Sequence, residues 1–270
     1  MKTRIIAGSS LTAVLFFLVF VAPKGLAAVI YGLMMAVGAY ELLYGTGIVR
    51  HTRLVLYSCG MAFIITLWSY NKAIHSHLLL LLLLFTAVLF IEMMADHVKV
   101  RIEMLAMCFM GGFVVPFLLT AVIRILSWKM GRYYIMMPFV IACVNDAGAY
   151  FVGMLFGKHK LAPVISPKKT VEGLFGGMAF AVLFMIGYCL ILQLTADFRI
   201  NYFYAFVYGV LGAGVGAFGD LCFSIIKRQT GIKDYGNLIP GHGGILDRLD
   251  SMMMVAPLIE ALLILMPVVR

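Results

Sequence analysis

Residues 78–91 read LLLLLLLFTAVLFI, a run without a single charged side chain. A strand of a transmembrane barrel would alternate apolar and polar residues over about ten positions, and this run does not alternate. A helix of about 20 apolar residues crosses roughly 30 Å of hydrocarbon. The run therefore predicts a transmembrane helix, and similar runs recur along the whole chain.

The composition is that of an integral membrane protein. Hydrophobic residues make up 63% of the 270 positions and charged residues only 12%, and the mean hydropathy is +1.04. An ordinary soluble domain is about half apolar and roughly a quarter charged. We predict an all-α, polytopic integral membrane protein with about nine transmembrane helices, at Ile5–Ala22, Leu26–Tyr44, Arg53–Tyr70, His77–Ala95, Ile102–Leu126, Tyr134–Gly157, Glu172–Leu194, Phe203–Ile226 and Ser251–Val269.

No Ser- or Pro-rich linker interrupts the spans, so we expect one membrane domain over residues 1–270. The first five helices carry few charges, which indicates a scaffold in residues 1–133. Residues 134–270 then hold the catalytic helices and loops, with the active site among the C-terminal helices. The first span follows Lys2 and Arg4 as a signal peptide would, but no small-x-small cleavage site stands out, and we interpret it as an ordinary helix.

The orientation follows from the basic residues. Fourteen of the 21 Lys and Arg residues fall on the side of the N-terminus and the even-numbered connections. The positive-inside rule then predicts a multi-pass protein of the cell (inner) membrane, with the N-terminus and the active site facing the cytoplasm. Eight of the fourteen lie in two connections that are also candidates for binding substrate. Without these eight residues, six Lys and Arg lie on the predicted cytoplasmic side and seven on the opposite side.

Charge and cysteine content narrow the partners. The net charge is +9, but no basic helix or aromatic-interleaved patch indicates nucleic acid. Anionic membrane lipids and phosphorylated substrates fit this charge better. The five cysteines all fall in apolar spans, where reduced thiols act as small hydrophobic side chains.

The stretch from Asp220 to Asp250 is the most unusual part of the chain. Four Asp, two Lys and two Arg lie within it, beside segments that must lie in lipid. Asp220, Ser224 and Lys227 share one helical face by their spacing. Gly216 and Gly212 precede them at steps of four, and small residues at that spacing let helices pack closely in membranes. We expect this face to point into the helix bundle, with Asp220 partnered by Lys227, Arg228 or a metal ion.

The ninth span is predicted to begin with Asp247, Arg248 and Asp250, so that the two carboxylates lie on one helical face. Two exposed carboxylates complementing a helix start is the alternative interpretation of such a pair. The preceding Gly241, His242, Gly243 and Gly244 favour a binding role, because glycines let backbone N–H groups approach a phosphate or a nucleobase.

The sixth span carries Asn145 and Asp146 at mid-membrane. A hydrogen bond between packed helices would explain such a pair by itself. Together with Asp220, Asp247 and Asp250 it places oxygen ligands on three helices, and oxygen ligands are those that Mg²⁺ prefers. We therefore name these five residues as candidate metal ligands and leave a second cation open.

A long motif now becomes recognisable. It reads Ser224-x-x-Lys227-Arg228-x4-Lys233-Asp234-x-Gly236-x2-Ile239-Pro240-x-His242-Gly243-Gly244-x2-Asp247-Arg248-x-Asp250. This pattern resembles the signature of the phosphatidate cytidylyltransferase family, the CDP-diacylglycerol synthases. Two further segments are similar to family segments, Ser166-Pro-Lys168-Lys169-Thr170-x-Glu172-Gly173 and Asn145-Asp146-x-x-Ala149-Tyr150.

The resemblance implies a CTP-dependent nucleotidyltransferase that converts CTP and phosphatidate to CDP-diacylglycerol and pyrophosphate and requires Mg²⁺. We expect metal-assisted, in-line attack of the lipid phosphate on the α-phosphate of CTP. The expected catalytic residues are Asp220, Lys227, Arg228, Asp247, Arg248 and Asp250. The expected substrate-binding residues are Lys168, Lys169, Ser224, Lys233, Gly241, His242, Gly243 and Gly244.

Two rival functions remain open. A transporter would also carry intramembrane carboxylates and a basic vestibule, although the glycine-rich loop has no obvious use in a transport pathway. Another CTP-dependent lipid enzyme, such as a polyprenol kinase or a synthase acting on ether lipids, would share the same motif. Glycine-rich helix faces are compatible with a homodimer, with no residue assignable to its interface.

Overall fold

The computed structural model describes residues 17–269 except 18, 72–76, 197 and 239–242. Helices dominate the fold, and within the described residues seven of them are long and apolar enough to cross a membrane. They span Lys24–Gly45, Thr52–Tyr70, Leu78–Ala95, Ile102–Ser127, Gly131–Phe156, Val171–Ala196 and Tyr202–Gln229. These confirm the second to eighth predicted spans, whereas the first lies almost wholly outside the described residues. The protein is thus an all-α, multi-pass membrane protein with one small two-stranded sheet.

The chain folds as two compact units. The first comprises residues 1–129 and 227–249, and the second comprises residues 130–226 and 250–270. The described helices before residue 129 all belong to the first unit. The loop after residue 227, which the sequence assigns to the catalytic half, packs with these scaffold helices.

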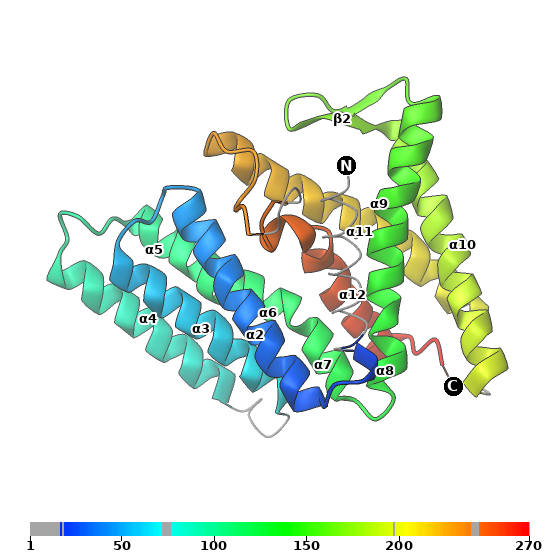
Figure 1. The fold of residues 1–270 in the computed structure, drawn as a ribbon, viewed down its shortest axis with the longest axis horizontal. Coiled ribbons are helices and arrows are strands. Elements are labelled where there is room, and N and C mark those ends of the chain that lie inside the picture. The colour runs from blue at the N-terminus through cyan, green and yellow to red at the C-terminus, as the bar shows by residue number, and fades with distance from the viewer. Residues whose placement is uncertain (1–16, 18, 72–76, 197, 239–242, 270) are drawn as a thin grey trace. The chain divides into compact units, whose positions relative to one another are not determined.

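In the first unit the helices α2 (Lys24–Tyr40), α3 (Thr52–Tyr70), α4 (Leu78–Ala95) and α5 (Ile102–Phe109) run side by side (Figure 1). Leu43, Leu54, Ile65, Phe85 and Leu105 belong to the buried core between them. Helix α4 buries little of its surface, because its apolar side chains face lipid.

Two spans of the first unit are not regular α-helices. Helix α2 continues as the π-helix η1 (Glu41–Gly45). The fourth span passes from α5 through the π-helix η3 (Met110–Val114) into α6 (Val115–Leu119) and α7 (Ala121–Ser127). Pro116 lies in the first turn of α6, directly after η3. Single π-turns of this kind often mark functional sites.

In the second unit, α8 (Gly131–Tyr134) leads into α9 (Met136–Phe156), which runs alongside α10 (Val171–Ala196). The connection between α9 and α10 forms an antiparallel hairpin of β1 (Lys160–Ala162) and β2 (Ser166–Thr170), which projects from one end of this pair (Figure 1). The sequence predicted no strand there.

Helix α11 (Tyr202–Gln229) packs in the second unit through its glycine face, as predicted. A Cβ atom added at Gly212 would lie 2.8 Å from Cγ2 of Ile141, and one at Gly216 would lie 2.9 Å from Cγ2 of Val255. Real Cβ atoms do not approach so closely, so these positions require glycine for the observed helix packing.

The ninth predicted span is shorter than expected. Helix α12 covers Met252–Leu265, 14 residues, which at 1.5 Å per residue extend only about 21 Å. The span was predicted to begin in a helix that includes Asp247. Instead, a separate 3₁₀ turn, η4 (Leu246–Arg248), precedes α12.

Candidate active site

Several of the predicted site residues fall in two polar clusters, one in each unit. The loop cluster of the first unit consists of Glu41, Lys227, Tyr235, Gly244 and Asp247. The oxygen cluster of the second unit consists of Asn145, Asp146, Asp220, Asp250 and Ser251.

The centre of the loop cluster is the ion pair between Lys227 and Asp247. The Lys227 Nζ atom donates to Oδ1 of Asp247 at 2.9 Å. Both side chains are largely buried, at 12% and 3% exposed, respectively. Nζ also lies 5.3 Å from the ring centroid of Tyr235, a cation–π contact. A buried charge pair of this kind holds its surroundings in place, because losing either partner would leave an uncompensated charge.

The same carboxylate organises the loop backbone. Its Oδ2 atom accepts the N–H of Tyr235 at 2.8 Å and the N–H of Gly244 at 3.0 Å. Gly243 has φ of +84°, a left-handed conformation that glycine adopts at no steric cost. The predicted glycine-rich turn is therefore built around Asp247. Its first two members, Gly241 and His242, lie outside the described residues.

The prediction that Asp247 and Asp250 share a helical face is wrong. Asp247 lies in the 3₁₀ turn η4, and Leu249 follows with φ of −118° and ψ of 8°, outside the α-helical region. Asp250 then precedes α12, and its Oδ1 atom accepts the N–H of Ser251 at 2.9 Å. The intervening turn breaks the α-helical spacing on which the prediction depended.

Glu41, which is not among the predicted site residues, belongs to the loop cluster. It lies in η1 and is only 4% exposed. Its carboxylate accepts the N–H groups of Ile245 at 3.1 Å and Leu246 at 2.9 Å. The only sequence signal for this role is a lone carboxylate near the end of an apolar span.

In the oxygen cluster, Asp220 has a protein partner that was not predicted. It forms an ion pair with Lys169 of β2, whereas the predicted partners were Lys227, Arg228 or a metal ion. Ser224, one turn later on α11, donates to Oδ1 of Asp220 at 3.2 Å, which confirms that these two share a face. The hairpin between α9 and α10 thus supplies the cation that neutralises this intramembrane carboxylate.

Helix α9 contributes Asn145 and Asp146 to this cluster, and Asp250 and Ser251 lie just before α12. The hydroxyl of Ser251 donates to Oδ2 of Asp146 at 3.1 Å. Asn145 is 2% exposed, and its Oδ1 atom has no hydrogen-bond partner among the described residues. A Cβ atom at Gly216 would lie 3.8 Å from Nδ2 of Asn145, and one at Gly219 would lie 2.9 Å from the carbonyl oxygen of Asp250. The glycine face of α11 therefore borders Asn145 and Asp250.

Glu172 closes the base of the hairpin that carries Lys169. Its carboxylate accepts the N–H groups of Lys158 and His159, and it lies 2.5 Å from Nδ1 of His159. Thr170 adds a cap, because its Oγ1 accepts the N–H of Gly173 at 3.1 Å. These contacts fix the end of β2 against the first turn of α10 and so position Lys169.

The remaining predicted cations lie on the surface. Lys168 of the hairpin is exposed, as are Arg228, Lys233 and Arg248 of the first unit. Exposed basic side chains can bind phosphate groups without first breaking a buried ion pair. The structure thus separates the predicted cations into two buried or half-buried partners of carboxylates and four exposed ones.

The side chains of the two clusters can be compared with the ligands that the predicted Mg²⁺ would need. In the described parts of either unit, no group of three or more His, Cys, Asp or Glu side chains is arranged to hold a metal ion. Mg²⁺ is commonly held by one or two carboxylates together with substrate phosphates and water, so a complete protein cage is not required. Asp220 fits that mode, because its carboxylate already faces one cation, the ammonium of Lys169.

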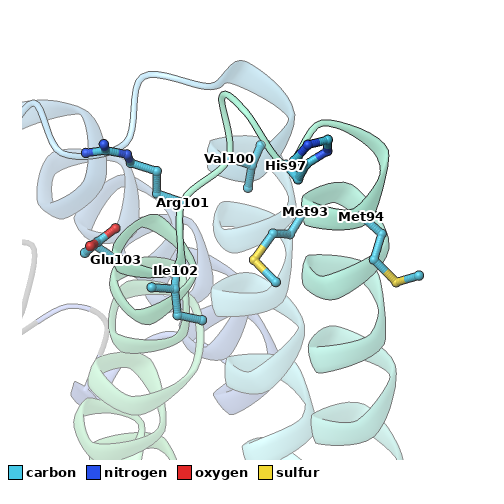
Figure 2. Close-up of a pocket in the computed structure, with 7 residues that line it drawn as sticks. All are labelled: Met93, Met94, His97, Val100, Arg101, Ile102 and Glu103. Carbon is cyan, nitrogen blue, oxygen red and sulfur yellow. The ribbon is translucent and has the colours of Figure 1, made fainter.

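Two cavities lie away from these clusters. One of about 480 Å³ lies in the first unit, where α4 ends and α5 begins (Figure 2). Met93, Met94 and Ile102 form its apolar wall, and His97, Arg101 and Glu103 are its charged or titratable groups (Figure 2). The other, of about 700 Å³, is lined by residues 199–202 of the second unit. Neither cavity contains a residue predicted for the site.

Comparison with known proteins gives a consistent result. The profile described as "Cytidylyltransferase family" matches residues 2–266. A protein named phosphatidate cytidylyltransferase from Staphylococcus epidermidis is 46% identical over 134 residues, and proteins of the same name from Staphylococcus saprophyticus and Staphylococcus aureus are 45% and 43% identical over 134 residues. Each match covers 50% of this chain and 50% of the relative, so the chain spans about half the length of the curated relatives it matches.

Proposed function

Because this chain belongs to the cytidylyltransferase family, we propose that it is a phosphatidate cytidylyltransferase of phospholipid biosynthesis. It would convert CTP and phosphatidate to CDP-diacylglycerol and pyrophosphate. The observation that carries this proposal is the 46% identity over 134 residues to a protein of that name. The two polar clusters support it, because they supply the cations and oxygen ligands that a reaction between two polyanions requires.

In the proposed reaction, an oxygen of the phosphatidate phosphate attacks the α-phosphorus of CTP. A new P–O bond forms, the bond between the α-phosphorus and the oxygen bridging to the β-phosphate breaks, and pyrophosphate leaves. The second pKa of a phosphate monoester is about 6, so phosphatidate is already anionic near neutral pH and needs no protein base. The protein's task is to position the two substrates and to neutralise their charge.

The exposed cations suit the task of neutralising the charge of the substrates. Arg228, Lys233 and Arg248 would bind the triphosphate and the departing pyrophosphate, and Lys168 would bind the lipid phosphate. Lys227 has a different part, because its ammonium is committed to Asp247 at 2.9 Å and thereby holds the loop. Lys169 is committed in the same way to Asp220.

We further propose Mg²⁺ as the cofactor, with Asn145, Asp146, Asp220 and Asp250 as the residues that would hold it. Bound there, Mg²⁺ would stabilise negative charge on the attacking and leaving oxygens of an in-line displacement. Asp247 was also predicted to bind the metal, and this stays a prediction. Its carboxylate accepts three hydrogen bonds within the loop cluster, from Lys227, Tyr235 and Gly244.

The experiment that tests the reaction follows two labelled phosphates. Purified protein in lipid nanodiscs would receive CTP labelled at either the α- or the γ-phosphate, with phosphatidate or a polyprenol as acceptor. We expect the α-label to enter lipid only with phosphatidate and the γ-label to leave as pyrophosphate. A γ-label entering polyprenol would identify a kinase, and no transfer to either lipid under any condition would overturn the proposal.

The basic residues also support a cell-membrane protein whose loop cluster faces the cytoplasm. Asn237 is exposed in the loop, so Asn237→Cys, in a variant without the five native cysteines, provides a label site. We expect an impermeant maleimide to react with it only after the cells are permeabilised. Reaction in intact cells would reverse this orientation.

A further inference from the structure

The π-helix η1 carries a buried carboxylate for which the proposed reaction has no direct use. Glu41 lies within the apolar span Lys24–Gly45 and is only 4% exposed. An ionisable group at such a position is costly unless it has partners, so it usually has a function. In this chain the partners are backbone N–H groups of the signature loop, the segment between α11 and α12 that carries most of the cytidylyltransferase motif.

Glu41 holds two successive residues of that loop. Its Oε1 atom accepts the N–H of Ile245 at 3.1 Å and its Oε2 atom accepts the N–H of Leu246 at 2.9 Å. These N–H groups lie at the start of the 3₁₀ turn η4, where backbone donors lack partners within the turn. Both carboxylate oxygens are therefore used to fix the turn that carries Asp247.

Close backbone packing shows that the loop is fitted to η1. A Cβ atom at Gly236 would lie 2.5 Å from Oε1 of Glu41, and one at Gly244 would lie 2.4 Å from Oε2. On the other side, a Cβ atom at Gly45 would lie 2.3 Å from the carbonyl oxygen of Tyr235. A side chain at Gly45 would collide with the loop backbone, and one at Gly236 or Gly244 would displace the carboxylate of Glu41.

The two buried carboxylates of the loop cluster act on adjacent residues. Gly244 donates its N–H to Asp247, and the next two N–H groups go to Glu41. Asp247 in turn binds Lys227 and the N–H of Tyr235. A change at Glu41 would therefore be transmitted through η4 to the Lys227–Asp247 pair.

We propose that Glu41 is a positioning residue for the reaction, which holds the signature loop in its active conformation from the scaffold helices. This inference rests on the proposed function. The carboxylate does not need to touch substrate, because it acts by placing Asp247 and the exposed Arg248 that follows it. The scaffold would then supply part of the active-site geometry.

The test compares two substitutions that separate charge from volume. Glu41→Gln keeps the shape of the side chain, but its amide group turns an N–H donor toward one of the two loop N–H groups. Glu41→Asp keeps the charge and both acceptor oxygens on a shorter stem. We expect Glu41→Gln to lower kcat/KM for CTP by about tenfold to a hundredfold, the loss typical of a hydrogen bond to a charged group, and Glu41→Asp to retain more activity than Glu41→Gln.

A residue that only fills space would give the opposite order, with Glu41→Gln near wild type and Glu41→Asp impaired, and that result would overturn the proposal. Glu103→Gln, an exposed carboxylate of α5, is the matched control and should keep wild-type kinetics. Activity lost only in step with global unfolding in a thermal melt would also count against Glu41 as a positioning residue.

Hydrogen exchange separates this inference from the proposed reaction. We expect Glu41→Gln to raise exchange in the peptide covering residues 243–249 while α3 and α4 stay protected. This local loosening can be measured even if the wild-type protein transfers no cytidylyl group. Unchanged exchange at residues 243–249 would show that Glu41 does not hold the loop.

Discussion

The two polar clusters differ in how their oxygen atoms are satisfied. In the loop cluster, the carboxylate oxygens of Asp247 and Glu41 accept hydrogen bonds from Lys227 and from four backbone N–H groups. In the oxygen cluster, Oδ1 of the buried Asn145 has no donor among the described residues. A carboxylate surrounded by backbone N–H groups organises a loop, whereas an acceptor without a donor leaves a hydrogen-bonding position that a water or a ligand can fill.

The energetics support this distinction. A buried polar atom without a partner costs about 1–3 kcal/mol, and such atoms are rare in native proteins unless an ion, water or function explains them. The loop cluster avoids that cost within the chain itself. In the oxygen cluster, a water, a cation or a substrate group bound at Asn145 would remove that cost.

The largest effect is expected from Asp220→Asn. This change removes the negative charge that Lys169 neutralises and that we propose helps to hold Mg²⁺. The transfer rate should therefore fall by about 10²- to 10³-fold, as when one electrostatic group is removed from an active site. The rate is measured with α-labelled CTP and phosphatidate in nanodiscs. Hydrogen exchange in residues 243–249 is measured in parallel, so that a loss of activity caused by loosening of the loop is recognised. Near wild-type turnover would remove Asp220 from the proposed mechanism.

A smaller loss of activity, with a different signature, is expected from Asp247→Asn. The amide keeps one acceptor oxygen but leaves the Lys227 ammonium uncompensated at a site where the carboxylate is 3% exposed. We expect a tenfold to hundredfold slower transfer, again the loss of a charged hydrogen bond, together with faster proteolysis of the loop. The control is Asp234→Asn, an exposed carboxylate of the same loop, which should leave cleavage unchanged. If proteolysis of the loop is unchanged in Asp247→Asn, the Asp247 carboxylate does not organise the loop, and this difference between the two clusters does not hold.

The same contrast explains what the sequence could predict. The spans followed from hydropathy, because helices satisfy their own backbone hydrogen bonds in lipid. The inward face of α11 followed from the four-residue spacing of Gly212, Gly216 and Asp220. Both predictions depend only on residues that are close together in the sequence. The metal ligands and the substrate contacts stay predictions, since they depend on groups that the fold must bring together.

The missed features are those that depend on distant contacts. Glu41 meets Ile245 across 204 positions of sequence, and no local pattern marks such a pair. Lys169 reaches Asp220 only because β1 and β2 form a hairpin, and Pro163 and Pro167 made strands there hard to foresee. The turn at η4 was missed because the i, i+3 spacing of Asp247 and Asp250 is equally compatible with an unbroken helix.

The smallest effect is expected from Ser251→Ala, which probes the oxygen cluster without changing its charge. The serine hydroxyl donates to Oδ2 of Asp146 at 3.1 Å, and a net hydrogen bond is worth about 1 kcal/mol. If Asp146 holds Mg²⁺, losing the bond that orients its carboxylate should raise the Mg²⁺ concentration for half-maximal transfer by about fivefold. Ser127→Ala is the control, because its hydroxyl donates to the carbonyl oxygen of Arg124 in the first unit. An equal shift in both variants, or none in Ser251→Ala, would mean that the oxygen cluster is not where the cation binds, and the contrast between the two clusters would then describe folding alone.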